Sequence, residues 1–327
     1  MKLIIQLPCY NEESTLPQTL ADLPRSVDGF DVVEWLVVDD GSQDATAEIA
    51  KSHGVDHVVR LPQNGGLARA FSKGIETCLE LGADVIVNTD ADNQYNGKDI
   101  PLLVAPVLKG EAHIAIGTRP IASIEEFSIF KKWLQALGSS VVRSLSLTEV
   151  DDAPSGFRAI SREAARKMNV FSRYTYTLET IIQAGQDGLT IQSVPIRVNP
   201  ATRESRLVKS VFSYVKRSII TLLRIFVVYR PMRFFITLSA LVSLVGLGLG
   251  VRYLYFFAIG EGSGHIQSVI LAALLLGSGL LLVVVALITD LIAVNRKLLE
   301  KIDWRIGKLE DHIAKSSNRS SETERGE

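Results

Sequence analysis

Two carboxylates separated by one residue follow a short apolar segment of this 327-residue chain. Asp90 and Asp92 come directly after the apolar segment 84–88. Carboxylates at positions i and i+2 beyond a strand end can hold Mg²⁺ or Mn²⁺, which prefer oxygen ligands. Such an ion bridges a diphosphate and neutralises the charge that develops on a leaving nucleotide. A pair of this kind is also common in ordinary polar loops, so the neighbouring loops decide its interpretation.

A second acidic loop, residues 39–42 (Asp-Asp-Gly-Ser), follows the apolar segment 35–38. A buried carboxylate in this loop can accept hydrogen bonds from the base or ribose of a nucleotide, and the glycine lets the backbone turn. The same loop has a plainer interpretation, because Ser42 or Asp44 could cap a helix that begins near Ala45 without any ligand. On this loop alone both interpretations stay open.

A third loop, residues 8–13 (Pro-Cys-Tyr-Asn-Glu-Glu), follows the first apolar segment at 3–7 and offers an aromatic face and two acids. Three acidic loops behind three apolar segments are far more informative than any one of them. Together they predict a site for a nucleotide and a divalent metal ion.

The elements that position these loops alternate regularly up to about residue 117. Short β-branched segments predict strands, and apolar residues at helical spacing predict helices between them. Such alternation is typical of a doubly wound α/β sheet, parallel at least in its first half, in which ligands bind beyond the carboxyl ends of the strands. Residues 120–200 are expected to complete the sheet and the acceptor side. The predicted strands are 3–7, 35–38, 57–60, 85–88, 114–116, 157–160 and 189–197, and the predicted helices are 14–23, 45–53, 67–81 and 100–108.

The three acidic loops, in this order and spacing, resemble those of the family 2 glycosyltransferases, which have a GT-A fold with a Rossmann-like, mostly parallel α/β sheet. Three later segments resemble more narrowly the branch of dolichol-phosphate mannose synthase and the polyprenyl-phosphate glycosyltransferases. The segments are 117–119 (Gly-Thr-Arg), 152–158 (Asp-Ala-Pro-Ser-Gly-Phe-Arg) and 204–206 (Glu-Ser-Arg). The resemblance covers about residues 2–210, and some members of that branch also carry a C-terminal membrane hairpin.

The resemblance implies roles for individual residues. The residues that would contact the nucleotide-sugar are Pro8, Tyr10, Glu12, Asp39, Asp40 and Asp90, and those that would hold the metal are Asp90, Asp92 and Gln94. The residues that would contact the lipid phosphate are Arg119, Arg158, Ser205 and Arg206. The catalytic residues at the transfer centre would be Asp92, Asp152 and Glu179. The last loop departs from the family pattern, because Pro200, Arg203 and Arg206 stand where members often have Arg, Gly and Lys.

The activity implied by the resemblance is inverting, metal-dependent transfer of a sugar from a UDP- or GDP-sugar to a polyprenyl phosphate, undecaprenyl or dolichyl. Mg²⁺ or Mn²⁺ would be the cofactor. A phosphate acceptor is already ionised near neutral pH, so it needs positioning more than deprotonation. Asp152 is therefore expected to orient the acceptor or to stabilise positive character at the sugar, rather than to act as an obligatory base.

Two other functions stay open on the sequence. The chain could transfer sugar to another lipid acceptor, or it could be a membrane protein that binds a nucleotide-sugar without catalysis. The acidic pair argues against the second. A processive polysaccharide synthase would normally show a QxxRW-type motif and more membrane spans, and a sugar nucleotidyltransferase would show a Gly-rich loop near its N-terminus. Neither pattern is present.

The last third of the chain predicts a membrane hairpin. Residues 234–259 and 266–289 are apolar and long enough to cross a bilayer. Residues 1–202 carry 18 basic and 26 acidic side chains, a net charge of −8, whereas residues 203–233 carry eight basic side chains and one acidic side chain, a net charge of +7. This basic collar suggests a surface that faces anionic lipid headgroups, and it overlaps an amphipathic interfacial helix expected at about 209–229.

Basic residues flank the outer ends of both spans, so we expect an integral membrane protein with its catalytic domain and both termini in the cytoplasm. A bacterial or archaeal inner membrane fits better than the endoplasmic reticulum. The expected organisation is a catalytic domain at 1–206, a juxtamembrane helix at 207–232, the hairpin at 233–294, and a C-terminal helix with a disordered tail at 295–327.

Two patterns bear on self-association. Leu299, Ile302, Ile306, Leu309 and Ile313 follow the spacing of a short coiled-coil seam, and Gly246 and Gly250 form a GxxxG pair in the first span. The seam predicts either an oligomer contact or a helix that rests on the domain or the membrane.

Other features exclude several classes of protein. Cys9 and Cys78 form neither a metal pair nor a disulfide framework, and the five histidines are scattered, so a zinc site is not expected. The N-terminus turns polar too soon for a signal peptide and is expected to be a strand. The expected partners are a nucleotide-sugar, a polyprenyl phosphate and a membrane, and no nucleic acid is expected.

Overall fold

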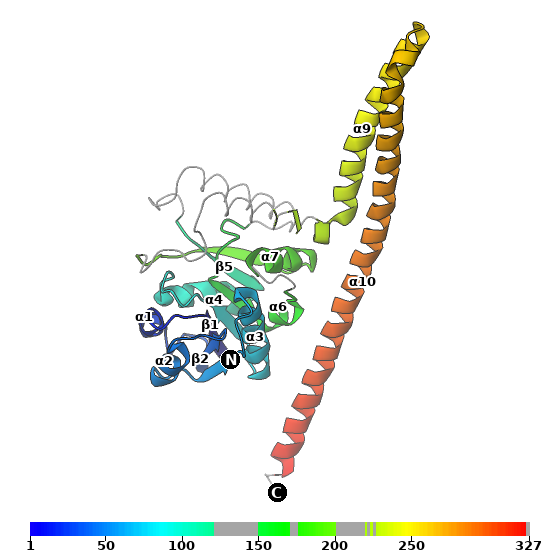
Figure 1. The fold of residues 1–327 in the computed structure, drawn as a ribbon. Coiled ribbons are helices and arrows are strands. Elements are labelled where there is room, and N and C mark those ends of the chain that lie inside the picture. Colours follow the sequence, from blue (N-terminus) through cyan, green and yellow to red (C-terminus); the bar gives the residue numbers. More distant parts are fainter. Residues whose placement is uncertain (121–149, 171–175, 201–219, 221–222, 225–226, 325–327) are drawn as a thin grey trace. The chain divides into compact units, whose positions relative to one another are not determined.

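The computed structural model describes residues 1–120, 150–170, 176–200, 220, 223–224 and 227–324, with the elements labelled in Figure 1. The chain divides into two compact units, Met1–Ser218 and Ile219–Glu327. The described part of the first unit contains a sheet with helices, and the described part of the second is helical.

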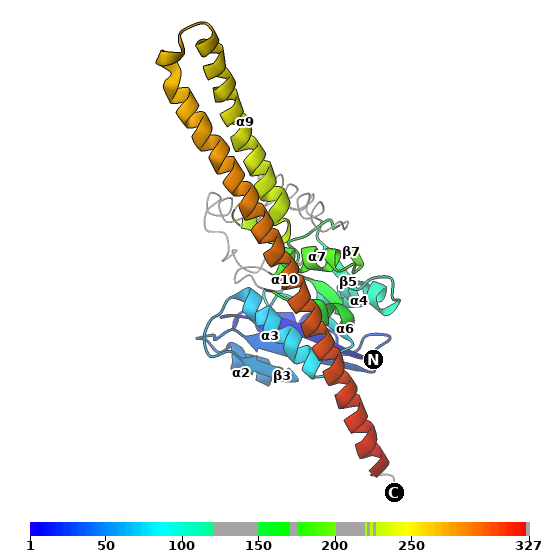
Figure 2. The same ribbon diagram turned by 90° about the vertical axis from the view of Figure 1, so that its right-hand side faces the viewer.

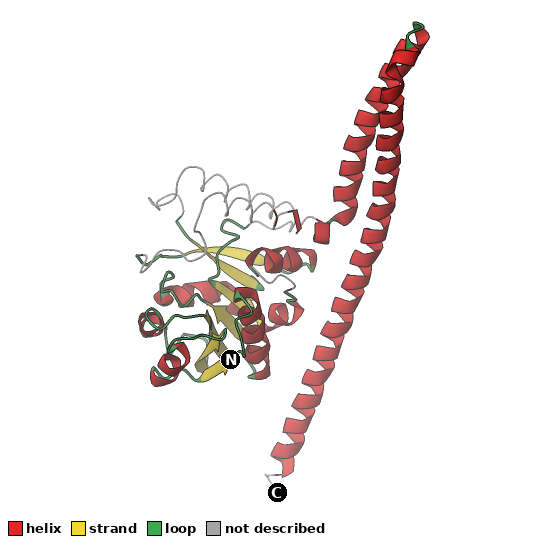
Figure 3. Cartoon of the chain, in the orientation of Figure 1, coloured by secondary structure: helices red, strands yellow, loops and turns green. Residues whose placement is uncertain are grey.

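Among the described residues, seven strands form one mixed sheet in the first unit (Figure 3). The strand order is β3-β2-β1-β4-β6-β5-β7, with parallel pairing in the first four strands. β6 lies antiparallel between β4 and β5, and β7 is parallel to β5. The expected α/β sheet, parallel in its first half, is confirmed. The strands are β1 (Lys2–Cys9), β2 (Val32–Asp39), β3 (His57–Arg60), β4 (Val85–Asn88), β5 (Ile114–Thr118), β6 (Arg158–Ser161) and β7 (Ile191–Pro195).

Helices connect the strands close to the predicted positions. The four helices expected in the first half are present with ends that differ from the prediction by two residues or fewer. Two more, α6 and α7, follow β6, and the second of these contributes to the site described below. The helices of this unit are α1 (Leu16–Asp22), α2 (Thr46–Ser52), α3 (Leu67–Glu80), α4 (Ile100–Leu108), α6 (Arg162–Lys167), α7 (Thr177–Gln186) and the 3₁₀ turn η1 (Gly97–Asp99).

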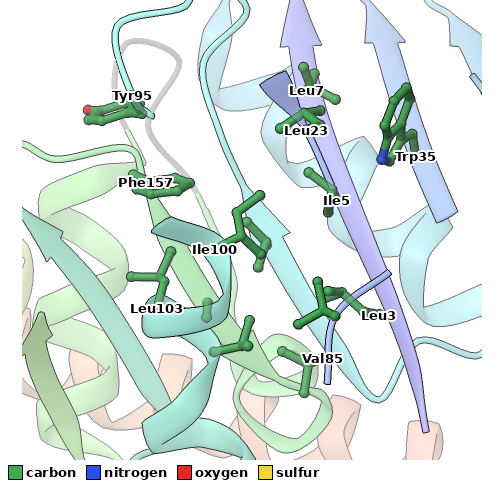
Figure 4. Packing of buried hydrophobic residues seen from close by; sticks show 14 of the residues in the cluster. Leu3, Ile5, Leu7, Leu23, Trp35, Val85, Tyr95, Ile100, Leu103 and Phe157 are labelled. Carbon is green, nitrogen blue, oxygen red and sulfur yellow. The ribbon is translucent and has the colours of Figure 1, made fainter. Parts of the chain in front are cut away.

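The central strand β1 is buried along seven of its eight residues, as expected for a parallel strand covered on both faces. Side chains alternate between the faces. Leu3, Ile5 and Leu7 point into the core shown in Figure 4, together with Ile100 and Leu103 of α4. The even-numbered side chains face α3, where a Cβ atom at its Gly74 would collide with Gln6. Packing on both faces fixes the strand ends from which the acidic loops emerge.

The second unit is a helical hairpin of α9 (Pro231–Ala258) and α10 (Ile266–Glu324), joined by the 3₁₀ turn η3 (Gly262–His265). α9 and α10 lie side by side in both views (Figures 1 and 2). Residues Pro231–Ala258 and Gly262–Arg296 are long and apolar enough to cross a membrane, and their most apolar 18-residue windows have mean hydropathies of 2.2 and 2.9. The two expected spans are therefore helices of the required length and composition.

Small residues allow the two helices of the hairpin to approach closely. Ser239 donates from its hydroxyl to the carbonyl oxygen of Gly279 at 2.7 Å. A Cβ atom at Gly246 would lie 3.1 Å from Leu275 Cβ, whereas one at Gly250 would have only Ala272 Cβ near it, at 4.0 Å. Only the first glycine of the GxxxG pair is therefore needed for close packing against α10.

Several sequence expectations concern residues that lie partly or wholly outside the described part of the chain. The amphipathic helix at 209–229 is described only at residues 220, 223–224 and 227–229. In the predicted seam, Leu299, Ile302 and Ile306 lie on α10 and are exposed, while the side chains of Leu309 and Ile313 are outside the description. Pairing of this seam with a second copy stays a prediction. Cys9 and Cys78 are free and buried.

Candidate active site

The loop after β4 carries Asp90 and Asp92 in a tight turn. Asn93 takes a positive φ of 56°, which asparagine tolerates better than most residues, and the backbone N–H of Gln94 donates to Asp92 Oδ1 at 3.1 Å. Thr19 of α1 donates to the carbonyl oxygen of Ala91 at 3.0 Å. The turn is thus held both from within and from the neighbouring helix.

The loops after β1 and β2 are joined by hydrogen bonds. The N–H of Asn11 donates to Ser42 Oγ at 2.9 Å, and the Asn11 side chain accepts from the N–H of Gln43 at 2.9 Å. Glu12 donates from its N–H to Thr46 Oγ1 at 2.9 Å. At the start of α2 the Ala45 side chain caps nothing, but Asp44 Oδ1 accepts from the N–H of Thr46, the first residue of the helix, at 3.1 Å. Ser42 therefore connects the two loops rather than capping the helix.

Asp39 ends β2 and is fully buried. Its Oδ1 accepts from the N–H of Ser42 at 2.9 Å. Its Oδ2 is buried 3.2 Å from Arg60 Nε and has no hydrogen-bond partner among the described residues. A buried carboxylate oxygen without a donor is costly, so this atom is suited to receive an N–H or O–H group from a ligand.

Asp40 has different surroundings from those expected of a nucleotide-binding residue. Its two carboxylate oxygens accept from the backbone N–H groups of Gly65 and Gly66, each at 2.8 Å. Burial raises the pKa of Asp40 although these two hydrogen bonds oppose the shift. Gly41 takes φ +70°, and a Cβ atom there would lie 2.8 Å from the backbone of Gln63. Asp40 therefore fastens the glycine loop that precedes α3.

Arg119, after β5, forms a two-pronged ion pair with Asp152. Arg119 Nε lies 2.7 Å from Asp152 Oδ2, and Nη2 lies 3.0 Å from Oδ1. Asp152 is fully buried. Burial opposes a charged guanidinium, but the bonds to Asp152 outweigh it and raise the pKa of Arg119. Paired planar groups of this kind are strongly oriented, so Asp152 fixes the direction of the Arg119 side chain.

Arg158 lies inside the protein, not at a surface where a phosphate could reach it. It is 1% exposed, and its guanidinium donates to three carbonyl oxygens and one hydroxyl. The acceptors are Ser155 O at 2.8 Å, Ala153 O at 2.9 Å, Thr177 O at 2.9 Å and Thr180 Oγ1 at 2.7 Å. The expectation that Arg158 binds the lipid phosphate is therefore replaced by an internal role, because its donors tie segment 152–158 to α7.

Gly156 brings segment 152–158 against the acidic loop. A Cβ atom on Gly156 would lie 3.1 Å from Asp90 Oδ1 and 3.2 Å from Oδ2, so the backbone passes directly beside this carboxylate. Burial, followed by the charge of Asp92, raises the pKa of Asp90 to about 7, and Arg119 acts in the opposite direction. The Asp90 carboxylate would be favoured in its charged form by a cation placed beside it.

The two carboxylates of the acidic loop suit a divalent ion that takes its remaining ligands from water and substrate. Within the described part of the chain, no group of three or more His, Cys, Asp or Glu side chains is placed to hold a metal. Mg²⁺ is often held by one or two carboxylates and completes its octahedron with waters and substrate phosphates. Asp90 and Asp92 are a pair of that kind.

The remaining predicted residues that the structure describes lie at the end of β1 and on α7. Pro8 belongs to β1, paired with Val38, and Tyr10 and Glu12 follow it, the first exposed and the second buried. Glu12 accepts from Thr15 Oγ1 at 2.7 Å. Glu179 is buried in the first turn of α7. Ser205 and Arg206 lie outside the described residues.

Asn88, Tyr95 and Tyr176 join the loops of the site but were not predicted from the sequence. Asn88, the last residue of β4, bonds to both Gly156 and Tyr176, and Tyr95 bonds to Gly156 from the other side. The one available signal was an amide at the end of an otherwise apolar strand. Its partners are 68 and 88 residues away in the chain, so only the fold identifies them.

Comparison with known proteins gives the family. The profile of Glycosyl transferase family 2 matches residues 4–168, about half of the chain. An undecaprenyl-phosphate mannosyltransferase of Micrococcus luteus is 29% identical over 206 residues, covering 60% of this chain and 83% of the relative. A UDP-N-acetylglucosamine–dolichyl-phosphate N-acetylglucosaminyltransferase of Methanococcus voltae is 30% identical over 213 residues, covering 58% of this chain and 83% of the relative.

A solved structure shares the fold. Glucosyl-3-phosphoglycerate synthase of Mycobacterium tuberculosis, crystallised with Mn²⁺, UDP and glucosyl-3-phosphoglycerate, superimposes with a TM-score of 0.52 at 24% identity. The match covers 68% of this chain and 78% of that one. The mixed sheet is thus of the expected GT-A type. With the family profile spanning all three acidic loops and relatives that act on lipid phosphates, the chain belongs to the family 2 glycosyltransferases.

Proposed function

We propose that this glycosyltransferase transfers a sugar from a UDP- or GDP-sugar to a polyprenyl phosphate, with inversion, at the cytoplasmic face of a membrane. Two relatives named above act on undecaprenyl and dolichyl phosphate. The chain also contains two helices long and apolar enough to span a membrane. A polyprenyl phosphate stays in the bilayer, so its transferase must bring the site to the headgroup plane.

One observation carries the proposal. The metal-type pair Asp90 and Asp92 and the oriented cation Arg119 adjoin the same short segment, 152–158, and the charge of Arg119 opposes the rise in the pKa of Asp90. Segment 152–158 joins them, since Gly156 passes beside Asp90 and Asp152 holds Arg119. A diphosphate donor needs a metal ion held by carboxylates, and a phosphate acceptor needs a cation nearby, so both substrates suit this arrangement.

The donor would lie at the acidic loops. Asp90 and Asp92, with Gln94 in the same turn, would hold Mg²⁺ or Mn²⁺ against the diphosphate. When bound, the ion neutralises charge on the departing nucleotide. Asp39 Oδ2 lies in an ion pair with Arg60 but accepts no hydrogen bond from the described residues, and it would receive a donor group of the base or ribose, beside Pro8, Tyr10 and Glu12. Asp40 would act indirectly, by fixing the glycine loop.

The acceptor would lie at Arg119. Its Nε and Nη2 are bonded to Asp152, and Nη1 bonds to none of the described residues, so this nitrogen can donate to a phosphate oxygen. A phosphate oxygen then attacks the anomeric carbon, and the bond from that carbon to the diphosphate oxygen breaks on the opposite face. Asp152 would act through Arg119 rather than as a base. Ser205 and Arg206 would add contacts to the same phosphate.

The hairpin would anchor the enzyme. At one end of the hairpin, Arg230 and Arg233 adjoin the start of α9, and Arg296 lies with its guanidinium carbon 4.6 Å from the centre of the Tyr229 ring. Cations and an aromatic ring are typical of a membrane interface on the cytoplasmic side. Both chain ends would then be cytoplasmic, as in a bacterial or archaeal inner membrane.

A donor panel tests the proposal. Purified full-length protein in detergent is given UDP- and GDP-sugars with Mg²⁺ or Mn²⁺, with and without undecaprenyl or dolichyl phosphate, and nucleotide release is measured. Lipid-dependent release that stops on chelation is the expected result. Release that depends instead on another lipid would replace the acceptor, and donor binding without turnover on any acceptor would leave a non-catalytic binding protein.

A further inference from the structure

Gly156 is held by hydrogen bonds on both sides of its backbone. Its N–H donates to Tyr95 Oη at 3.0 Å, and its carbonyl oxygen accepts from Asn88 Nδ2 at 2.7 Å. Asn88 and Tyr95 stand just before and just after the Asp90/Asp92 pair in the chain. Residues at both ends of the acidic loop therefore bind the backbone of Gly156 in segment 152–158. We call this arrangement the Gly156 clamp.

Both side chains of the clamp are rigidly supported. Asn88 is fully buried, and its Oδ1 accepts from Gln6 Nε2 at 2.9 Å, which fixes the orientation of the amide. Its Nδ2 also donates to Tyr176 Oη at 2.9 Å. The Tyr95 ring is stacked on Phe157 at 5.1 Å between centroids, and the two lie side by side in Figure 4. Rings and amides packed in this way have little freedom to move.

The clamp lies between the two halves of the site. On one side the Gly156 backbone passes beside the Asp90 carboxylate, because a Cβ atom added to Gly156 would lie 3.1 Å from Asp90 Oδ1. On the other side the same segment begins with Asp152, which orients Arg119. A shift of Gly156 would therefore change the separation between the metal-type carboxylates and the acceptor-side cation.

We infer that Asn88 and Tyr95 are positioning residues that set the distance between the donor side and the acceptor side of the site through Gly156. The inference rests on the proposed function for the identity of the two sides. It goes beyond that function because Asn88 and Tyr95 both bond to the backbone of the facing segment at Gly156. Reacting groups displaced by about 1 Å can lose about 100-fold in rate.

Tyr95→Phe is the sharpest test. It removes one oxygen, leaves the ring stacked on Phe157, and deprives the Gly156 N–H of its acceptor. We expect kcat to fall about tenfold or more, while KM for the nucleotide-sugar changes less than about threefold. Hydrogen–deuterium exchange should rise in residues 152–158, because the amide loses its protection.

Ser161→Ala is the matched control. Ser161 caps α6 by accepting from the N–H of Ala164 at 3.2 Å, and it pairs with Val85 at the start of β4, the end opposite the acidic loop. This variant also loses one side-chain hydrogen bond, and it should retain the kcat of the native enzyme.

The outcomes separate the clamp from the proposed function. A fall in kcat no larger than that of Ser161→Ala, despite faster exchange at 152–158, would show that the clamp has only a structural role and would overturn the inference. A donor KM that rises in proportion to the fall in kcat would also overturn it. If the native enzyme turns over no polyprenyl phosphate, the proposed function fails, and the kinetic comparison is made with whichever acceptor supports turnover. The hydrogen–deuterium exchange measurement needs no turnover at all. Unchanged exchange at residues 152–158 in Tyr95→Phe would by itself refute the clamp.

Discussion

Asp39 and Asp40 are neighbours that carry the same functional group, yet their carboxylates have different surroundings. Asp39 keeps one buried oxygen without a hydrogen-bond donor, whereas both oxygens of Asp40 accept backbone N–H groups. Asp39→Asn should therefore raise the donor KM about tenfold with little loss of stability. Asp40→Asn should cost about 1–3 kcal/mol, since an amide cannot accept from both Gly65 and Gly66. Steady-state kinetics and urea unfolding of both variants check this, and a reversed pattern would contradict it.

At Asp92 a single negative charge is expected to decide whether the metal ion binds. Asp92→Asn keeps the size of the side chain and leaves its Oδ1 able to accept the N–H of Gln94, so the fold should persist. The loss of one of two metal-type carboxylates should lower metal-dependent turnover by at least about 100-fold. Turnover and circular dichroism are measured together. Turnover equal to that of the native enzyme would remove the metal assignment from this loop.

At the scale of the elements, Asp56 joins the turn before β3 to β2 itself and to the segment that precedes β2. Its carboxylate accepts from the N–H of Trp35 at 2.7 Å and from Arg25 at 2.6 Å. Burial acts to raise the pKa of Asp56, but these two bonds outweigh it and hold the pKa below the usual value. Stability from this group is therefore present above about pH 4 and is lost as the pH falls through the lowered pKa.

Asp56→Asn should consequently unfold more easily at pH 7, by about 1 kcal/mol after allowance for solvent screening. The difference from the native protein should shrink below about pH 4. Denaturant unfolding at pH 7 and pH 3 measures both. A difference that stays constant with pH would mean that the charge of Asp56 contributes nothing.

Within the hairpin, the two glycines of the GxxxG pair differ in their surroundings. Gly246→Ala would bring a methyl group to 3.1 Å from Leu275 Cβ, whereas Gly250→Ala would find its nearest contact at 4.0 Å. We expect the first variant to lose thermal stability in detergent by an amount typical of overpacking, about 1–3 kcal/mol, and the second to be unchanged. Equal melting temperatures for the two variants would argue against this helix contact.

The order of elements could be predicted from sequence because it depends on local patterns. Alternating strands and helices locate the acidic loops, and the parallel first half follows from that alternation. The insertion of β6 between β4 and β5 could not be predicted, because strand order depends on long-range pairing. Arg158 was misplaced for a related reason: a guanidinium suits phosphate in general, and only the fold shows carbonyl oxygens around this one. The junction of Asn88 with Gly156 likewise lies between distant segments.

At the scale of the whole molecule, the orientation of the chain across a membrane is the property that links the site to its lipid substrate. Gly264, in the turn between α9 and α10, has no neighbouring atoms within 4 Å of an added Cβ, so Gly264→Cys should be tolerated. The native cysteines give little background, because burial raises the pKa of both thiols. A membrane-impermeant thiol reagent should label Gly264→Cys in intact cells if both chain ends are cytoplasmic.

Lys109→Cys supplies the opposite arm of that experiment. This residue is exposed at the end of α4, in the unit that holds the site, and should be labelled only after the cells are opened. Labelling of Lys109→Cys in intact cells, with protection of Gly264→Cys, would invert the proposed topology. The site would then lie on the face away from cytoplasmic nucleotide-sugars, and the proposed reaction could not draw on them. Labelling of both variants in intact cells would instead show that the hairpin does not cross the membrane.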